Sequence, residues 1–293
     1  IVVGCTLLND PQDDHRGRGR LLHYDAALRL KNTLWIDDTT HIVQGCRFAP
    51  DGTLWAFDAF AYKIVRFDRH GRRIANFKAP PRSFAHVTFA PDGSFYMGEN
   101  FVGERSRVPL RTTLPFMPGT RRFGDGHLFH FARDGRLLRE YATATHGGIG
   151  GFQGLTASVL LSDRRTLLYT SESGPIVFRY DLAKARQLPH LVAHGDNSGH
   201  FYFDLTLDSA GRLLVVAGSK VEARDPNSGT LLHEYALPDF GWASMSPVLD
   251  DCVVLVNFFS GQVAKLDLRS GRLVATAQTG INRSAAGAAQ FGV

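Results

Sequence analysis

The chain has 293 residues, a formal net charge of +5 at neutral pH and a hydrophobic content of 44%. With a charged fraction of 21%, this composition is typical of a globular protein with a sizeable core, and it excludes an intrinsically disordered chain. No apolar run approaches the roughly 20 residues that a membrane-spanning helix needs, so we expect no membrane partner. The basic residues are scattered and form no stripe with aromatic residues, which argues against a nucleic-acid partner.

The three cysteines, Cys5, Cys46 and Cys252, are few, odd in number and far apart. This pattern argues against a disulfide framework and against a structural zinc site. We therefore expect a reducing compartment, the cytoplasm. The periplasm is the alternative, because the first residue is not Met and a leader could have been removed.

A repeated phrase, FAPDG, occurs at Phe48–Gly52 and again at Phe89–Gly93. In both copies apolar runs flank the turn residues Pro-Asp-Gly, as in a β-hairpin. A second turn signal, as in FDRHGR, follows and recurs at intervals of roughly 40 to 50 residues, a length typical of propeller repeats, except between the second and third copies, where residues 105–123 add length. Its six copies lie at residues 23–29, 66–72, 130–136, 179–186, 223–230 and 265–272.

Each repeat predicts four short strands. In one unit, TLWAFD (53–58), KIVRFD (63–68) and RIANF (73–77) are the second, third and fourth strands. Six such units predict an all-β, six-bladed β-propeller that forms a single domain over residues 1–293. Residues 1–37 supply only the last three strands of the first unit. We therefore expect the C-terminal segment 284–293 to add the missing strand and close the ring.

The third unit contains an insertion at residues 105–123, rich in Arg and Pro, which is a candidate lid or docking arm. The loops of the repeats also differ in composition. The first-to-second-strand turns are generic. The loops between second and third strands, and the connections between blades, carry Asp, Asn, Glu and His. Because these two kinds of loop share one face of a propeller, we expect function at the channel mouth on that face.

Histidines gather at the same face. Because several precede or begin an innermost strand in successive blades, they are expected to meet near one rim of the channel. Neutral imidazole is the commonest transition-metal ligand, so we predict a Zn, Fe or Mn site there. A hydrogen bond from each histidine to a loop carbonyl is the structural alternative. The predicted ligands are His41, His86, His146 and His200, with His194 in reserve.

Oxygen donors on the same rim offer Ca²⁺ as a further candidate for the metal, although Asp and Asn are also common turn residues. These donors are Asp58, Asn100, Asp196, Asn197, Asp204 and Asn257. Two acidic residues, Glu99 and Glu172, end second strands and are candidates for a general base or for orienting a histidine. Arg105, with Arg122 as the alternative, is a candidate for binding an anionic group.

The motifs FAPDGTLW, IVRFDRHGRRI and QGL resemble those of the gluconolactonase/regucalcin (senescence marker protein) and NHL-repeat propellers, and APDGTLW is similar to streptogramin-lyase repeats. The resemblance covers nearly the whole chain and implies the six-bladed fold. The gluconolactonase metal set is not reproduced, since Gln153 stands at an Asn position and AAGAAQF lacks the first-blade acid. Asp204 lies near the fifth-blade Asp. The histidine placement is similar to an NHL-type lyase that cleaves peptidyl-hydroxyglycine with histidine-bound zinc.

The sequence therefore predicts a metal-dependent enzyme that acts on a small organic substrate at the channel mouth. The expected reaction is hydrolysis of an ester or lactone, or eliminative cleavage by a lyase. The alternative is a non-catalytic propeller that binds a ligand or a protein partner through the same face. The sequence leaves the oligomeric state open.

Overall fold

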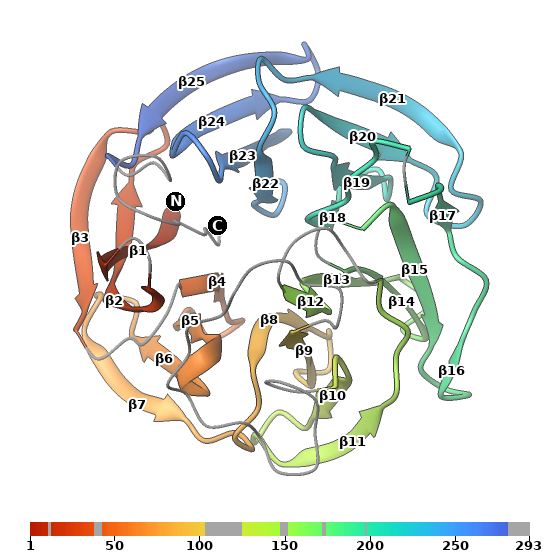
Figure 1. The fold of residues 1–293 in the computed structure, drawn as a ribbon, viewed down its shortest axis with the longest axis horizontal. Coiled ribbons are helices and arrows are strands. Elements are labelled where there is room, and N and C mark those ends of the chain that lie inside the picture. The colour runs from red at the N-terminus through yellow and green to blue at the C-terminus, as the bar shows by residue number, and fades with distance from the viewer. Residues whose placement is uncertain are drawn as a thin grey trace.

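The computed structural model describes residues 1–10, 13–37, 43–102, 125–146, 152–171, 174–196 and 198–280. In this part of the chain, six antiparallel sheets surround a common axis as the blades of a β-propeller (Figure 1). The predicted all-β, six-bladed fold is confirmed. Within these ranges the one helical segment is the short 3-10 turn Ala59–Ala61, and no helix is long and apolar enough to cross a membrane.

The first blade contains three described strands, in the order β1-β2-β3. These are β1 (Val2–Asp10), β2 (Asp13–Tyr24) and β3 (Leu30–Ile36). They are the second, third and fourth strands that the sequence predicts for the first unit. The segment predicted to close the ring, residues 284–293, lies outside the described residues, as does the insertion at 105–123.

Blades two to four begin with the innermost strand and run outward (Figure 1). The second blade comprises β4 (Val43–Phe48), β5 (Leu54–Asp58), β6 (Lys63–Phe67) and β7 (Arg73–Phe77). The third comprises β8 (Phe84–Phe89), β9 (Phe95–Val102), β10 (Leu128–Phe131) and β11 (Leu137–Tyr141), and β12 (Phe152–Gly154) also pairs with β9. The fourth comprises β13 (Ala157–Leu160), β14 (Thr166–Thr170), β15 (Ile176–Asp181), β16 (Arg186–Gln187) and β17 (Val192–Ala193).

The last two blades repeat the same four-stranded order. The fifth comprises β18 (Leu205–Leu207), β19 (Leu213–Val216), β20 (Lys220–Arg224) and β21 (Leu231–Ala236). The sixth comprises β22 (Trp242–Met245), β23 (Cys252–Asn257), β24 (Gln262–Asp267) and β25 (Arg272–Gln278). In Figure 1, β4, β8, β13, β18 and β22 lie nearest the centre of the ring.

The FAPDG phrases form the turns between first and second strands. Asp51 accepts hydrogen bonds from the backbone N–H of Thr53 at 2.9 Å and from its hydroxyl at 2.7 Å, and Asp92 binds Ser94 in the same way. The glycine that follows each aspartate has a positive φ, 81° at Gly52 and 87° in the second copy. Glycine adopts this conformation without a steric penalty, which explains the Pro-Asp-Gly sequence at both turns.

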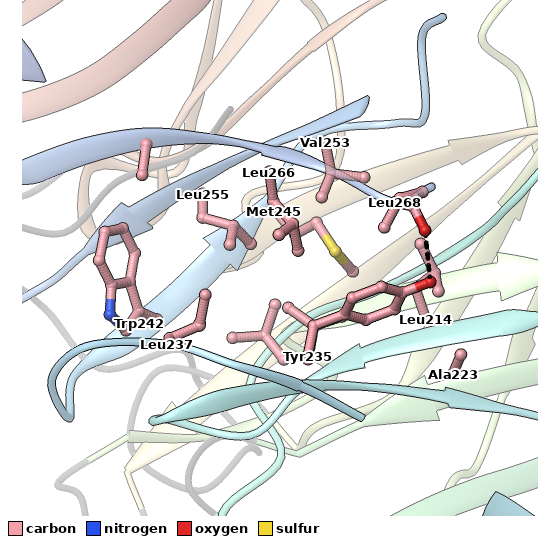
Figure 2. Close-up of a cluster of buried hydrophobic side chains, with 13 residues drawn as sticks. Leu214, Ala223, Tyr235, Leu237, Trp242, Met245, Val253, Leu255, Leu266 and Leu268 are labelled. Carbon is pink, nitrogen blue, oxygen red and sulfur yellow. Dashed lines mark hydrogen bonds between the residues drawn. The ribbon is translucent and has the colours of Figure 1, made fainter. Parts of the chain in front are cut away.

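The hydrophobic core is divided into wedges between neighbouring blades. Figure 2 shows the wedge between the fifth and sixth blades, where Trp242 and Met245 of β22 pack with Leu255 of β23. Tyr235 of β21 closes this wedge, and its hydroxyl donates a 3.0 Å hydrogen bond to the carbonyl oxygen of Leu268. Because each wedge joins two blades, the packing fixes the ring around its axis.

Two glycines allow inner strands to approach each other closely at the axis. A Cβ atom on Gly45 of β4 would lie 2.4 Å from the carbonyl oxygen of Ala85 in β8. A Cβ atom on Gly98 of β9 would lie 2.2 Å from Cε1 of His86 and 2.6 Å from the carbonyl oxygen of Leu155. Only glycine fits at either position, so these contacts determine how the central side chains are packed.

Candidate functional site in the central channel

Polar side chains from separate blades meet in a small cavity at the propeller axis. Arg47 of β4, His86 of β8 and Asp204, which precedes β18, line a space of about 40 Å³ together with Ser244 of β22. A water molecule occupies ~30 Å³ of liquid, so this cavity has room for about one or two. The cavity therefore collects a cation, an imidazole and a carboxyl group in a confined polar space.

Asp204 is fixed by hydrogen bonds from three groups. Its Oδ2 accepts the backbone N–H of Met245 at 2.8 Å and the hydroxyl of Ser244 at 3.3 Å, and its Oδ1 accepts the N–H of Leu205 at 2.8 Å. Burial raises the pKa of Asp204, and the charge of Arg47 and these donors offset only part of that rise. The carboxyl group is therefore rigid and retains a proton more readily than an exposed aspartate.

His86 is held neutral by its surroundings. Burial, followed by the positive charge of Arg47, lowers its pKa to about 3. Its Nε2 lies 2.8 Å from the hydroxyl oxygen of Ser158 in β13. Its Nδ1 is buried and meets no well-formed hydrogen-bond partner among the described residues. The imidazole is therefore uncharged at neutral pH, with Nε2 engaged by Ser158 and Nδ1 without a well-formed partner among the described residues.

A larger cavity of about 600 Å³ lies on the other side of Arg47, at the ends of the inner strands. It has polar walls from Arg47, Thr88, Ser158 and Thr206, and its volume is in the range of small-molecule pockets. Arg47 and Val87 line both cavities, so the two adjoin along the axis. Its apolar walls include Phe48, Phe89, Leu160, Leu161 and Leu207.

The larger cavity opens among the first-to-second-strand turns, since Pro91, Ser162 and Pro247 line it. The sequence places the functional mouth on the opposite face. Residues 103–124 and 147–151, which belong to loops that the sequence predicts for that face, lie outside the described residues. The larger cavity is therefore a candidate functional site on the face opposite the one that the sequence predicts.

The predicted base Glu99 lies in β9 and is fully buried. Both oxygens of its carboxylate have hydrogen-bond partners. Its Oε2 accepts the backbone N–H of Asp125 at 2.9 Å and that of His127 at 3.3 Å. Arg82 Nη1 lies 3.4 Å from Oε1. Burial raises the pKa of Glu99, and these donors offset part of the rise. Glu99 thus anchors the loop that leads into β10, and it does not line either cavity described above.

The three other predicted histidines that the structure describes make two separate contacts. The rings of His194 and His200 stack, with centroids 3.7 Å apart and planes at 8°, and His194 Nε2 lies 3.1 Å from the hydroxyl of Tyr202. His146 Nε2 lies 2.9 Å from Asp196 Oδ1. The structure thus brings His194 and His200 together, whereas the hydrogen bond of His86 is to Ser158 at the axis.

A metal ion needs several donors aimed at one point. Among the described residues, no three His, Cys, Asp or Glu side chains are grouped in this way. Parallel stacked rings such as His194 and His200 do not direct their nitrogens to a shared ion, so the described pairs do not fit a transition metal. The other predicted site residues, His41, Arg105, Arg122 and Glu172, lie outside the described residues. The metal site therefore stays a prediction.

Several polar residues of the channel were not predicted from the sequence, among them Arg47 and Ser158. Arg47 and Ser158 both line the larger cavity, and Arg47 also lines the smaller one. One signal was present in the repeat. The residue before each FAPDG phrase is polar, Arg47 in the first copy and Thr88 in the second, and both face the channel. A polar residue inside an apolar innermost strand is the pattern that marks a channel-lining position.

No protein-family model and no curated protein matches this sequence. Among solved structures, a chain in the crystal structure of a nidogen/laminin complex matches with a TM-score of 0.62 at 11% identity, covering 100% of this chain and 99% of that one. A virginiamycin B lyase from Staphylococcus aureus matches with a TM-score of 0.56 at 12% identity, covering 96% of this chain and 90% of that one. At these identities the likeness shows a shared propeller fold.

Proposed function

We propose that the protein is an enzyme that cleaves a small organic substrate in its central channel, by hydrolysis of an ester or lactone or by elimination. The observation that carries this proposal is the convergence of Arg47, His86 and Asp204 from three blades beside a cavity of about 600 Å³. Buried ionisable groups with perturbed pKa values next to a pocket are typical of active sites.

The three side chains supply the functions that either reaction needs. Arg47 carries the charge that stabilises a developing oxyanion or enolate. Neutral His86 is the candidate to accept a proton and return it to the leaving group, and Asp204, whose pKa is raised, is a second candidate donor. The larger cavity holds the body of the substrate against its apolar walls.

The comparison with solved structures supports elimination as one of the reactions to test. The lyase that matches this chain was solved as a catalytically inactive histidine-to-alanine variant with quinupristin. A propeller of similar shape therefore carries a lyase activity that a histidine substitution removes. We transfer to this chain only the reaction class, as part of the proposal.

The first test is a panel of aryl esters, lactones and cyclic ester substrates offered to the purified protein. We expect turnover that falls at least tenfold in kcat/KM when Arg47→Gln removes the charge at the axis. Arg69→Gln is the matched control, because Arg69 lies on an exposed outer turn, and it should retain wild-type turnover. Activity that is equal in the two variants would contradict the proposed site.

Metal dependence, predicted from the sequence, has its own test. The metal content of the purified protein and the effect of a chelator on turnover are measured together. A stoichiometric metal that disappears in His41→Ala, with loss of turnover, would support the predicted ligand at the rim. Turnover that persists without bound metal would indicate that the side chains at the axis catalyse the reaction.

A specific observation favours binding of a partner as a second candidate function. Phe240 and Phe259 expose 49% and 43% of their surface on the face opposite the larger cavity, and Phe201 lies against Phe240 with ring centroids 5.7 Å apart. Exposed aromatic clusters often mark interaction sites. If the panel gives no turnover and the double variant Phe240→Ser/Phe259→Ser loses a partner captured by the wild type, binding is the better account.

A further inference from the structure

We propose that Ser158 is a nucleophile, with His86 as its base, and that the substrates are carboxylic esters or lactones which form a covalent acyl-serine intermediate. This inference deepens the proposed function and rests on it for the identity of the substrate. It differs from the metal-dependent chemistry that the sequence predicts, because it makes a side chain the attacking group. Its basis is the contacts of Ser158, the place of this residue in the lining of the larger cavity and the position of Arg47.

The hydrogen bonds around Ser158 leave its hydroxyl as a donor. Its Oγ lies 2.8 Å from Nε2 of His86 and 2.8 Å from Oγ1 of Thr88. Thr88 donates its single hydroxyl proton to the carbonyl oxygen of Ser158 at 2.7 Å, so it has no proton left to give to Oγ. The Ser158 proton is therefore directed toward His86 Nε2 or Thr88 Oγ1. A serine hydroxyl within hydrogen-bond reach of an imidazole is the arrangement that activates a nucleophile.

The two nitrogens of the His86 ring differ in their contacts. Nε2 lies against the hydroxyl of Ser158, whereas Nδ1 is buried and has no well-formed hydrogen-bond partner among the described residues. In a neutral imidazole one nitrogen carries a proton and the other accepts one. A proton on Nδ1 leaves Nε2 as the acceptor for Ser158.

Access to the nucleophile comes from the larger cavity. Ser158 and Thr88 line that cavity, whereas His86 lines the smaller cavity behind them. A substrate in the larger cavity thus meets the serine first, with the base on the far side. Arg47 lines both cavities and can place its charge beside the carbonyl oxygen that becomes an oxyanion.

The reaction balances without a further reagent except water. Oγ of Ser158 bonds to the carbonyl carbon while its proton passes to Nε2 of His86, and the carbonyl π pair moves to oxygen. When the carbonyl re-forms, the C–O bond to the alcohol breaks and His86 returns the proton to the departing oxygen. Water then attacks the acyl group, its proton passes through His86 to Oγ, and the free acid leaves.

The experiment is active-site labelling of the intact chain with a fluorophosphonate, followed by peptide mapping. We expect one adduct per chain on Ser158, none in Ser158→Ala, and at least tenfold slower labelling in His86→Gln. Ser270→Ala is the control, because Ser270 is exposed in the turn between β24 and β25 and lines neither cavity. It should label like the wild type. Absence of an adduct on Ser158 in the wild type would overturn the inference.

Turnover separates this inference from the proposed function. Rapid-mixing assays on an aryl ester should show an initial burst of alcohol from the wild type and none from Ser158→Ala. Ester cleavage that is unchanged in Ser158→Ala would overturn the nucleophile and leave the proposed function standing. A Ser158 adduct in a protein that turns over no ester, lactone or elimination substrate would support the nucleophile and contradict the proposed function.

Discussion

At the scale of single residues, His86 shows how burial and charge determine a protonation state. Burial and the neighbouring Arg47 lower its pKa from an ordinary value of 6.5 to about 3. Protonating a buried histidine that has no countercharge costs more free energy than protonating an exposed one. The same neutral ring then serves as the hydrogen-bond partner of Ser158.

The depressed pKa of His86 predicts a pH-dependent stability. The unfolded chain binds more protons than the folded one between pH 6.5 and about 3, so the contribution of His86 to the free energy of unfolding is present above pH 6.5 and is lost as pH falls. Each unit of pKa difference corresponds to about 1.4 kcal/mol. Urea unfolding at pH 4.5 and 7.5 should show a larger loss for the wild type than for His86→Gln. Equal losses would contradict the buried neutral ring.

Gly98 leads to a second prediction at this scale. Because an added Cβ would lie 2.2 Å from His86 Cε1 and 2.5 Å from Leu155 Cβ, Gly98→Ala should destabilise the fold by about 1–3 kcal/mol and displace the imidazole. Gly195→Ala is the control, since nothing lies within 4 Å of its added Cβ, and its stability should stay near that of the wild type. Urea unfolding measures both, and similar stabilities for the two variants would count against the close packing at the axis.

At the scale of elements, the repeat contains enough information to predict most strands. The expected strands at 53–58, 63–68 and 73–77 correspond to β5, β6 and β7. This works because the turn residues and the alternation of apolar residues are local properties. The FAPDG turns and the outer Asp-containing turns, such as the one in which Asp68 accepts the N–H groups of His70 and Arg72, both form as expected.

The direction of side chains was harder to predict than the strands themselves. Register shifts occur near the start of three inner strands: between Val43 and Gly45, between Phe84 and His86, and between Trp242 and Ser244. A shift of one residue turns the following side chains to the other face of the strand. The shift in β8 lies beside His86 and leaves no clear mark in the sequence, so the direction of the His86 side chain could not be predicted. Ser158 lies in β13, which pairs with β14 without a shift, and nothing in the repeat marks it as a channel residue.

The FAPDG turn supports a prediction about backbone strain. Gly52 has a φ of 81° and nothing within 4 Å of an added Cβ, so a substitution there tests conformation without a clash. Gly52→Ala should cost ~1 kcal/mol, and Gly52→Asn less, because Asn tolerates the left-handed region better. Thermal unfolding of the three proteins measures the order. Equal stability of the Ala and Asn variants would contradict a strained turn.

At the scale of the whole molecule, contacts between neighbouring units hold the ring together. A buried ion pair within the fifth blade lies beside one of these contacts, the wedge between the fourth and fifth blades. Arg224 of β20 donates to Glu222 at 2.7 Å and to the carbonyl oxygen of Gly229 at 2.7 Å, and Tyr202 hydrogen-bonds to Glu222 at 3.2 Å. Burial pushes the pKa of Glu222 upward, but Arg224 and Lys220 outweigh it and the pKa is lowered.

Removing one partner of this buried pair should be costly. Arg224→Met leaves Glu222 buried without its main counterion, and losses of ~3–5 kcal/mol are usual in that situation. Arg72→Met is the control, because the Arg72–Asp68 pair is exposed, and exposed substitutions usually change stability by less than about 0.5 kcal/mol. Urea unfolding should separate the two variants clearly. A small effect of Arg224→Met would show that water reaches the pair.

The central claim is that chemistry takes place at the propeller axis, and kcat/KM of histidine variants on a cleaved substrate tests it most directly. We expect His86→Gln to lose at least tenfold, while His233→Gln, on the outer strand β21, keeps the wild-type value. Circular dichroism confirms that both variants are folded. If His194→Gln and His200→Gln abolished turnover and His86→Gln did not, the site would lie at the rim and the claim of chemistry at the axis would be wrong.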